Sequence, residues 1–269
     1  MRASVLLHFS TIVLLCGFPC PAQESSTING NWLLTGSWNS PERRPWLTVT
    51  VGVVGDRVFA QGNFQLLCSN GVGAGVQPLL KGPIAADGTF LLTALSSKPP
   101  YTMTISGRIP DRESVQWSGN YTFTMATARG ECSTGDSFVA NKLPALRGIF
   151  SGTLQLTRTQ LPDHPGEVTV TVDMTQAELV TFETPKGSLG KMPLQATIAL
   201  SGSNKFPSEK LTSVKGSEIR GDHFNLIFYD NNGEQIMLNG SYIDAGEQQL
   251  HVLLARGANV SAGGILTRR

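Results

Sequence analysis

The sequence predicts an all-β protein made of two tandem antiparallel domains, barrel-like or sandwich, that arose by internal duplication. Three observations predict this class. Apolar and polar residues alternate along most of the chain, short turn signals separate the alternating segments, and four motifs recur in the same order in both halves. No segment has the 3.6-residue period of an amphipathic helix.

The alternation is the pattern of a strand with one face in a core and the other in water. It is clearest over six segments, three in each half: residues 47–53, 101–105, 121–125, 168–173, 194–201 and 224–228. Turn signals such as Asp87-Gly88 and Asn231-Asn232-Gly233 lie between such segments and favour short hairpin connections. A meander order of strands is therefore expected in each half.

The two halves resemble each other at four corresponding places. Trp32–Trp38 parallels Gly148–Leu154, Gly82–Leu92 parallels Gly216–Leu226 with Phe90 matching Phe224, Ile105–Gly107 parallels Leu238–Gly240, and Gly130 with Gly135 parallels Gly257 with Gly263. A repeat of this length predicts two similar domains, at residues 23–143 and 147–269. Chance similarity of Gly-rich strands, or one fused domain that shares a continuous sheet, are the alternatives.

The first 22 residues have the layout of a secretory signal peptide. Arg2 precedes an apolar run over residues 5–15, and small residues Cys20 and Ala22 precede Gln23. This predicts cleavage before Gln23 and an exported mature protein, periplasmic or secreted. Lipidation at Cys16 or Cys20 is the alternative. No later stretch approaches 18 consecutive apolar residues, so the mature chain is expected to have no membrane-spanning helix.

Cys68 and Cys132 are the two cysteines that remain after signal cleavage. An even pair in an exported chain predicts a disulfide, with two buried free thiols as the alternative. The second half contains no cysteine, so the bridge belongs to the first half.

Composition argues against several classes of function. The formal net charge of +1 and the lack of a basic cluster argue against electrostatic capture of nucleic acid or of an anionic membrane. An outer-membrane barrel of about sixteen strands is possible in principle. It is disfavoured because aromatic residues make up only 7% and the chain ends in Arg268-Arg269.

No catalytic or metal motif is recognisable. The mature histidines, His164, His223 and His251, have no spacing that places two imidazoles on one face, and we interpret them as surface or strand-face residues. Carboxylates are spread singly through predicted turns, although a glycosidase pair could be assembled by the fold. The sequence predicts no catalytic residue, no metal ligand and no cofactor.

Tryptophans are the most suggestive candidates for ligand binding. Exposed aromatic rings stack on sugars or line apolar cavities, so Trp32, Trp38 and Trp117 are candidate ligand-binding residues. Buried barrel plugs are the alternative interpretation.

Gly30-Asn31-Trp32, at the start of the first predicted strand, is similar to the Gly-x-Trp start of lipocalins. That resemblance implies an eight-stranded barrel that holds a small apolar ligand. The chain also resembles uncharacterised exported bacterial proteins of repeated β segments in three pieces: Gly148–Thr153, the Cys68 and Cys132 pair, and Gly263–Arg268. This second resemblance implies export and fold, and it carries no information about activity.

The expected function is that of an exported, non-enzymatic binding or envelope-associated module. A lipocalin-like carrier of an apolar molecule and a carbohydrate-active hydrolase are the alternatives. A small apolar ligand or a carbohydrate is the expected partner. A carrier needs a cavity lined by residues such as Trp32, Phe90 and Phe224, whereas a hydrolase needs two facing carboxylates.

The intact mass of the exported protein tests the processing prediction. We expect a chain that starts at Gln23 and that is alkylated at Cys68 and Cys132 only after reduction. A lipid-sized mass increment at Cys16 or Cys20 would contradict this prediction.

Overall fold

The computed structural model describes residues 28–36, 46–68, 73–97, 100–109, 114–157, 166–184, 187–206, 208–244, 248–258 and 260–269. These residues form strands and turns, and none of them belongs to a helix that could cross a membrane. The predicted signal peptide and Trp38 lie outside the described residues.

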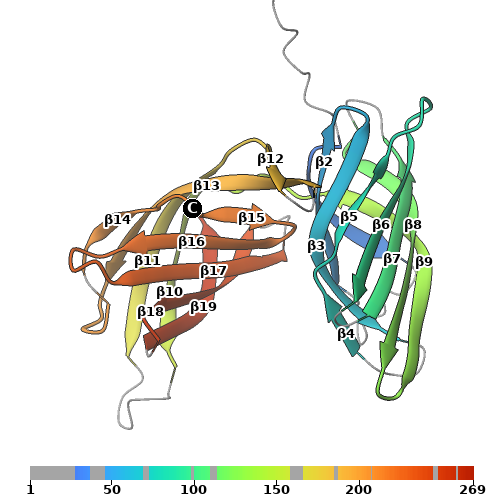
Figure 1. Ribbon diagram of the computed structural model, residues 1–269. Coiled ribbons are helices and arrows are strands. Elements are labelled where there is room, and N and C mark those ends of the chain that lie inside the picture. The colour runs from blue at the N-terminus through green and yellow to red at the C-terminus, as the bar shows by residue number, and fades with distance from the viewer. Residues whose placement is uncertain are drawn as a thin grey trace, which may run out of the picture.

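The first half of the chain folds into one closed antiparallel barrel (Figure 1). Its strands are β1 (Gly30–Gly36), β2 (Trp46–Val54), β3 (Arg57–Leu67), β4 (Gly73–Val76), β5 (Leu79–Pro83), β6 (Thr89–Ser97), β7 (Pro100–Arg108), β8 (Gln116–Thr127) and β9 (Gly130–Lys142). Strand β4 is a short addition to β3, and the other eight strands form the barrel.

The second half folds into another closed barrel. Its strands are β10 (Arg147–Leu156), β11 (Glu167–Gln176), β12 (Val180–Thr184), β13 (Gly187–Ser201), β14 (Lys210–Thr212), β15 (Glu218–Arg220), β16 (His223–Tyr229), β17 (Gln235–Asp244), β18 (Gln249–Arg256) and β19 (Val260–Arg268). Strands β12 and β14 both pair with β13 outside the ring of eight.

Both barrels are meanders in which each ring strand pairs with the next one along the chain. The first ring closes by pairing of β1 with β9, and the second by pairing of β10 with β19. The prediction of two antiparallel domains is confirmed. Of the two predicted architectures, barrel and sandwich, both domains adopt the barrel. The strands of the two halves belong to separate sheets and do not form one continuous sheet.

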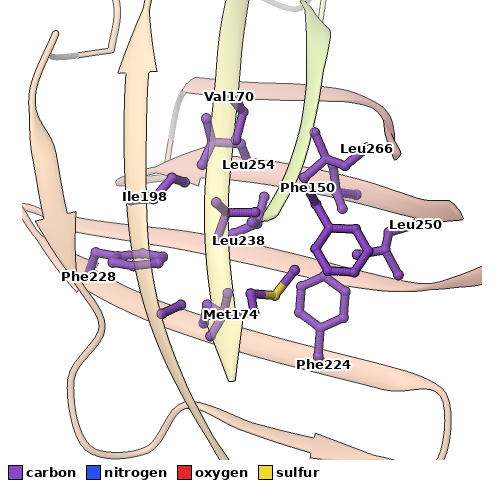
Figure 2. Packing of buried hydrophobic residues seen from close by; sticks show 14 of the residues in the cluster. Phe150, Val170, Met174, Ile198, Phe224, Phe228, Leu238, Leu250, Leu254 and Leu266 are labelled. Carbon is purple, nitrogen blue, oxygen red and sulfur yellow. The ribbon is translucent and has the colours of Figure 1, made fainter. Parts of the chain in front are cut away.

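Large apolar side chains fill the interior of each barrel. In the second barrel Phe150, Met174 and Leu250 point toward one another from different strands (Figure 2). Phe150 and Leu250 are fully buried, as is Trp32 in the first barrel. Interiors packed with side chains are the usual state of eight-stranded barrels.

The duplication predicted from the sequence is confirmed by the strand order and by one repeated pairing. Phe90 on β6 lies opposite Gly107 on β7, and Phe224 on β16 lies opposite Gly240 on β17. A Cβ atom on Gly240 would lie 2.5 Å from Cζ of Phe224, and one on Gly107 would lie 3.0 Å from Cζ of Phe90. The phenyl ring therefore covers the glycine in both barrels, which explains why both positions recur in the sequence.

One element breaks the symmetry of the repeat. Strand β2 connects to β3 through the short turn Gly55-Asp56, whereas the corresponding strands β11 and β13 are separated by the added strand β12. Strand β12 and the first part of β13 form a hairpin that extends from the second barrel to β2 and β3 of the first (Figure 1).

The disulfide between Cys68 and Cys132 is buried in the core of the first barrel. Cys68 follows β3 and Cys132 lies on β9, and their Cα atoms are 5.1 Å apart. Because β3 and β9 are not neighbours in the sheet, the bridge joins strands that no ladder connects. A disulfide of this kind is typical of proteins that fold outside the reducing cytoplasm.

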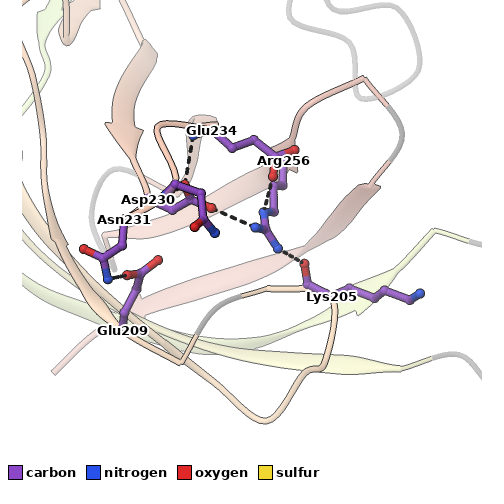
Figure 3. A network of polar contacts seen from close by, with 7 residues as sticks. Lys205, Glu209, Asp230, Asn231, Glu234 and Arg256 are labelled. Carbon is purple, nitrogen blue, oxygen red and sulfur yellow. Dashed lines mark hydrogen bonds and ion pairs between the residues drawn. The ribbon is translucent and has the colours of Figure 1, made fainter.

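A polar network fixes the end of the second barrel where β16 turns into β17 (Figure 3). Asp230 accepts hydrogen bonds from the amides of Glu234 and Asn232 and from Arg256, which together hold its pKa below the usual value. Arg256 also donates to the Lys205 carbonyl at 3.0 Å. The network ties the turn to β18 and to the loop before β14.

Removal of the disulfide should destabilise the first barrel selectively. Cys68 and Cys132 are 64 residues apart, and opening a loop of that size lowers the free energy of unfolding by roughly 4 kcal/mol in the chain-entropy model. We expect this loss in the Cys68→Ala, Cys132→Ala double variant, measured by urea unfolding.

Tryptophan fluorescence reports the first barrel alone, because all four tryptophans belong to the first half of the chain. Far-ultraviolet circular dichroism provides the comparison, because it follows both barrels. Wild-type protein in reductant should behave like the double variant. A double variant as stable as the oxidised wild type would contradict the prediction.

Candidate functional site: a cleft between the two barrels

The two barrels meet at a buried carboxylate. Asp222 lies in the turn between β15 and β16 and is only 1% exposed. Its Oδ1 accepts a hydrogen bond from Oγ1 of Thr48, on β2 of the first barrel, at 2.5 Å. Nδ1 of His223 lies 2.6 Å from the same oxygen. A carboxylate removed from water requires such donors, so this contact joins the barrels specifically.

Gly221, the residue before Asp222, also bonds to the first barrel. The contacts of these two residues together form a polar joint between the barrels. The backbone amide of Gly221 donates to Oδ1 of Asn31 at 3.1 Å and lies 2.8 Å from Oγ1 of Thr50. Gly221 has a φ of +59°, and a Cβ atom there would lie 2.6 Å from Oγ1 of Thr48. Glycine is therefore required both by the backbone conformation and by the close approach of the barrels.

An apolar contact lies beside the polar joint. Phe59 points out of the first barrel, since its neighbours Val58 and Ala60 belong to the core, yet it is only 3% exposed. Cβ atoms on Gly190 or Gly52 would lie within 2.4 Å of its ring. The β12–β13 hairpin therefore covers Phe59, which gives the added hairpin a structural role at the interface.

The segment between the barrels is held on both sides. The amide of Leu143 donates to the carbonyl of Asn31 in the first barrel at 2.8 Å. The hydroxyl of Tyr242, in the second barrel, donates to the Pro144 carbonyl at 2.6 Å. Leu146 is buried in the second core. Three kinds of contact thus fix the barrels relative to each other: the polar joint, the packing of the hairpin on Phe59, and the hydrogen bonds of the connecting segment.

A cleft of about 490 Å³ opens next to this joint and is bounded by both barrels. The first barrel contributes Gln61, Gly62, Asn63 and Gln77, and the second contributes Glu218, Arg220, His223, Phe224, Asn225, Asn239, Gly240, Ser241, His251 and Leu253. Its size is within the range of small-molecule sites. Five of these side chains are amides, which gives the cleft paired donors and acceptors.

Strand register explains how the polar side chains come together. His223, Ser241 and His251 lie opposite one another on β16, β17 and β18. Two residues further along β16, Asn225 lies opposite Asn239. Both rows point outward because Phe224 and its cross-strand neighbours between them face the core. The cleft wall is therefore a two-row polar surface on a rigid sheet.

The charges of the cleft largely compensate each other. Nη2 of Arg220 forms an ion pair with Oε1 of Glu218. Glu218 is also the only carboxylate among the residues that line the cleft, because Asp222 is enclosed in the joint. Apart from its imidazoles the cleft presents neutral hydrogen-bonding groups.

One atom of the cleft stands out among the described residues. Oδ1 of Asn225 is shielded from solvent and has no hydrogen-bond partner within that part of the chain. A buried carbonyl oxygen without a donor is unfavourable by about 1–3 kcal/mol. A donor supplied by a ligand in the cleft would remove this penalty.

A larger concave surface of about 890 Å³ lies on the outside of the first barrel. It is the counterpart of the cleft, since Phe90 and Gly107 line it where Phe224 and Gly240 line the cleft. Five of its lining residues are Ser or Thr, and the others include Arg108, Asn120, Phe138 and Val139. All the residues that line this surface belong to the first barrel. The smaller cleft is the stronger candidate site, because both barrels and two imidazoles contribute to it.

Of the tryptophans predicted to bind ligand, Trp32 and Trp117 do not line the cleft, and Trp38 lies outside the described residues. Trp32 is fully buried and donates from Nε1 to the Ile28 carbonyl at 2.8 Å. Trp117 is 6% exposed and packs edge-on against Trp32 and Phe138 with centroid separations of 6.0 and 5.1 Å. Both belong to the core cluster of the first barrel, as the plug interpretation describes.

Sequence reasoning missed the residues that form the cleft. The sequence predicts surface or strand-face positions for His223 and His251, and it does not show that the sheet brings them into one row. Asn225 and Asn239 lie at alternating, outward positions, and that pattern was the available signal. No group of three or more potential metal ligands occurs among the residues described.

Comparisons with protein-family models, with curated proteins and with solved structures found no match for this chain.

His223 connects the joint to the cleft. Its side chain is 49% exposed on the cleft side, while Nδ1 contacts Asp222. The hydrogen bond and negative charge of Asp222 hold the pKa of His223 above its usual value, and partial burial opposes this effect. The folded protein therefore binds the His223 proton more tightly than the unfolded chain does.

The stability of the joint should depend on pH through His223. The pKa of His223 is raised above its ordinary value of 6.5. Its stabilising contribution is thus complete below about pH 6.5 and is lost as pH rises through the raised value. We expect His223→Gln to lower Tm at about pH 5.5 by on the order of 1–2 °C and to have less effect at about pH 9.

Thermal unfolding of both proteins across this range checks the prediction. The matched control is His251→Gln, which is on the same row but two strands further from the joint. If the Tm difference between wild type and His223→Gln grew with rising pH, the prediction would be wrong. Titration of the His223 imidazole by NMR gives the direct measurement of its pKa.

Proposed function

We propose that this chain is an exported, non-enzymatic binding module that holds a hydroxyl-rich ligand, a carbohydrate, in the cleft between its barrels. The observation that carries the proposal is the amide pair Asn225 and Asn239 in a cleft where Oδ1 of Asn225 is buried without a donor. Amides and hydroxyls bind sugar hydroxyls because each side can both donate and accept.

The rigid interface supports the same proposal. The cleft walls belong to different barrels, and Asp222, Gly221 and Phe59 hold those barrels in one arrangement. A site whose walls are already in place loses little conformational entropy when it binds a ligand. This favours binding of a defined small ligand over adaptation to many partners.

Two observations favour this function over the other candidates. A carrier of the lipocalin kind needs an interior cavity, whereas Phe90 and Phe224 take part in packed barrel cores. A glycosidase of the usual kind needs two facing carboxylates. The described cleft lining contains Glu218 alone, and Arg220 neutralises it.

Titration with neutral oligosaccharides tests the proposal. Maltose, lactose, cellobiose and their longer homologues would be titrated into the mature protein and followed by calorimetry. We expect Asn225→Ala and Asn239→Ala each to weaken binding about tenfold, since a neutral hydrogen bond contributes about 1 kcal/mol. The matched control is Gln235→Ala, an exposed amide on β17 outside the cleft.

The outcomes separate the candidate functions. If sugar binding persisted when both Asn225 and Asn239 were replaced by Ala, the ligand would bind elsewhere and the proposal would be wrong. Uptake of an apolar fluorescent probe with no response to sugars would favour the carrier. Hydrolysis of a bound oligosaccharide would favour the enzyme.

A further inference from the structure

The polar cleft has an apolar border on the second barrel. Leu253 lines the cleft and is 43% exposed, and Ile265 on the next strand is 49% exposed. Leu253 pairs with Gly263, and His251 pairs with Ile265. Leu253 and Ile265 are therefore diagonal neighbours on the outer face, and the residue opposite Leu253 has no side chain to separate them.

This border continues away from Ile265 along the same face. Met237 lies opposite Ile227 on one side and Ala255 on the other. Asn239 lies opposite Leu253, so Met237 is the diagonal neighbour of Leu253 on β17. The outward side chains thus change from amides to aliphatic groups at the edge of the cleft.

The barrel core does not require these side chains. The residues that alternate with them, including Leu238, Val252 and Leu254, point inward and are fully buried. Single exposed aliphatic residues are common on protein surfaces. Here, in contrast, Leu253 and Ile265 adjoin each other and continue directly from a polar cleft that is proposed to bind ligand.

We propose that the ligand of the cleft is amphiphilic: an uncharged carbohydrate head in the cleft, joined to a hydrocarbon chain that lies over Leu253 and Ile265. The ion pair of Arg220 with Glu218 leaves no unpaired guanidinium in the cleft lining to favour an anionic head. This inference rests on the proposed function and names the class of ligand for the same site.

Comparison of sugars with their octyl glycosides tests the inference. Maltose, lactose and cellobiose would be titrated beside the corresponding octyl glycosides, kept below their critical micelle concentrations. We expect the octyl form of a bound sugar to bind about tenfold more tightly, because burial of even two methylenes on an apolar surface gives an effect of that size.

Ile265→Ser should reduce the gain from the octyl chain to within about twofold and leave the affinity for the unmodified sugar unchanged. Leu253→Ser provides a second variant that should also lose the gain. The matched control is Ile149→Ser, since Ile149 on β10 is 44% exposed and lies outside the border. Both glycoside and sugar should bind this control as they bind the wild type.

Failure of the inference can be distinguished from failure of the proposed function. If a sugar bound but its octyl glycoside bound no more tightly, the inference of an amphiphilic ligand would be wrong. The same holds if the Ile265→Ser variant kept the higher affinity for the octyl glycoside. Either result would leave the proposed carbohydrate site intact. No binding of sugar or glycoside would overturn the proposed function itself. Octyl binding that is unaffected by Asn225→Ala combined with Asn239→Ala would indicate adsorption of detergent and overturn the inference.

Discussion

The relative arrangement of the two barrels depends on a polar joint built around one buried carboxylate. Asp222 lies between the barrels, almost completely removed from water, and its Oδ1 receives donors from Thr48 of the first barrel and His223 of the second. Removing a partner from a buried charge is strongly unfavourable, because the ion then lacks both water and donors. Rotation or separation of the barrels would have that effect, so the joint restricts their relative orientation.

The joint also determines the cleft, because both are built from the same short segment. The turn that carries Gly221 and Asp222 leads directly into β16, which begins at His223 and presents Asn225 two residues later. The opposite wall, Gln61 and Asn63, belongs to β3, whose residue Phe59 is covered by the β12–β13 hairpin. Each wall of the cleft is therefore attached to a contact that holds the barrels together.

Duplication followed by divergence accounts for the difference between the two outer surfaces. Both barrels retain the phenyl-over-glycine pair and a concave surface above it. In the first barrel that surface is lined by residues of that barrel alone, five of them Ser or Thr. In the second barrel the corresponding surface faces a wall formed by the first barrel. The β12–β13 hairpin, which the first barrel does not share, and the polar joint lie where the second barrel's surface faces the first barrel across the cleft.

The sequence alone determined the strands, the turns, the duplication and the disulfide. Alternation at Tyr101, Met103 and Ile105 is a local property, and so is the turn at Asp87-Gly88, since side-chain direction in a strand and backbone freedom at glycine depend on immediate neighbours. Cys68 and Cys132 are paired by elimination, because the other two cysteines, Cys16 and Cys20, lie in the predicted signal peptide.

The tertiary structure alone decided the joint and the cleft. Thr48 and Asp222 are 174 residues apart, and no local pattern shows that they meet. His223 and His251 become neighbours of Ser241 only through the register of three strands. Trp32 and Trp117 lie inside the barrel, and their positions there follow from closure of the sheet. Contacts between distant segments depend on how complete barrels pack, and that information is distributed over the whole chain.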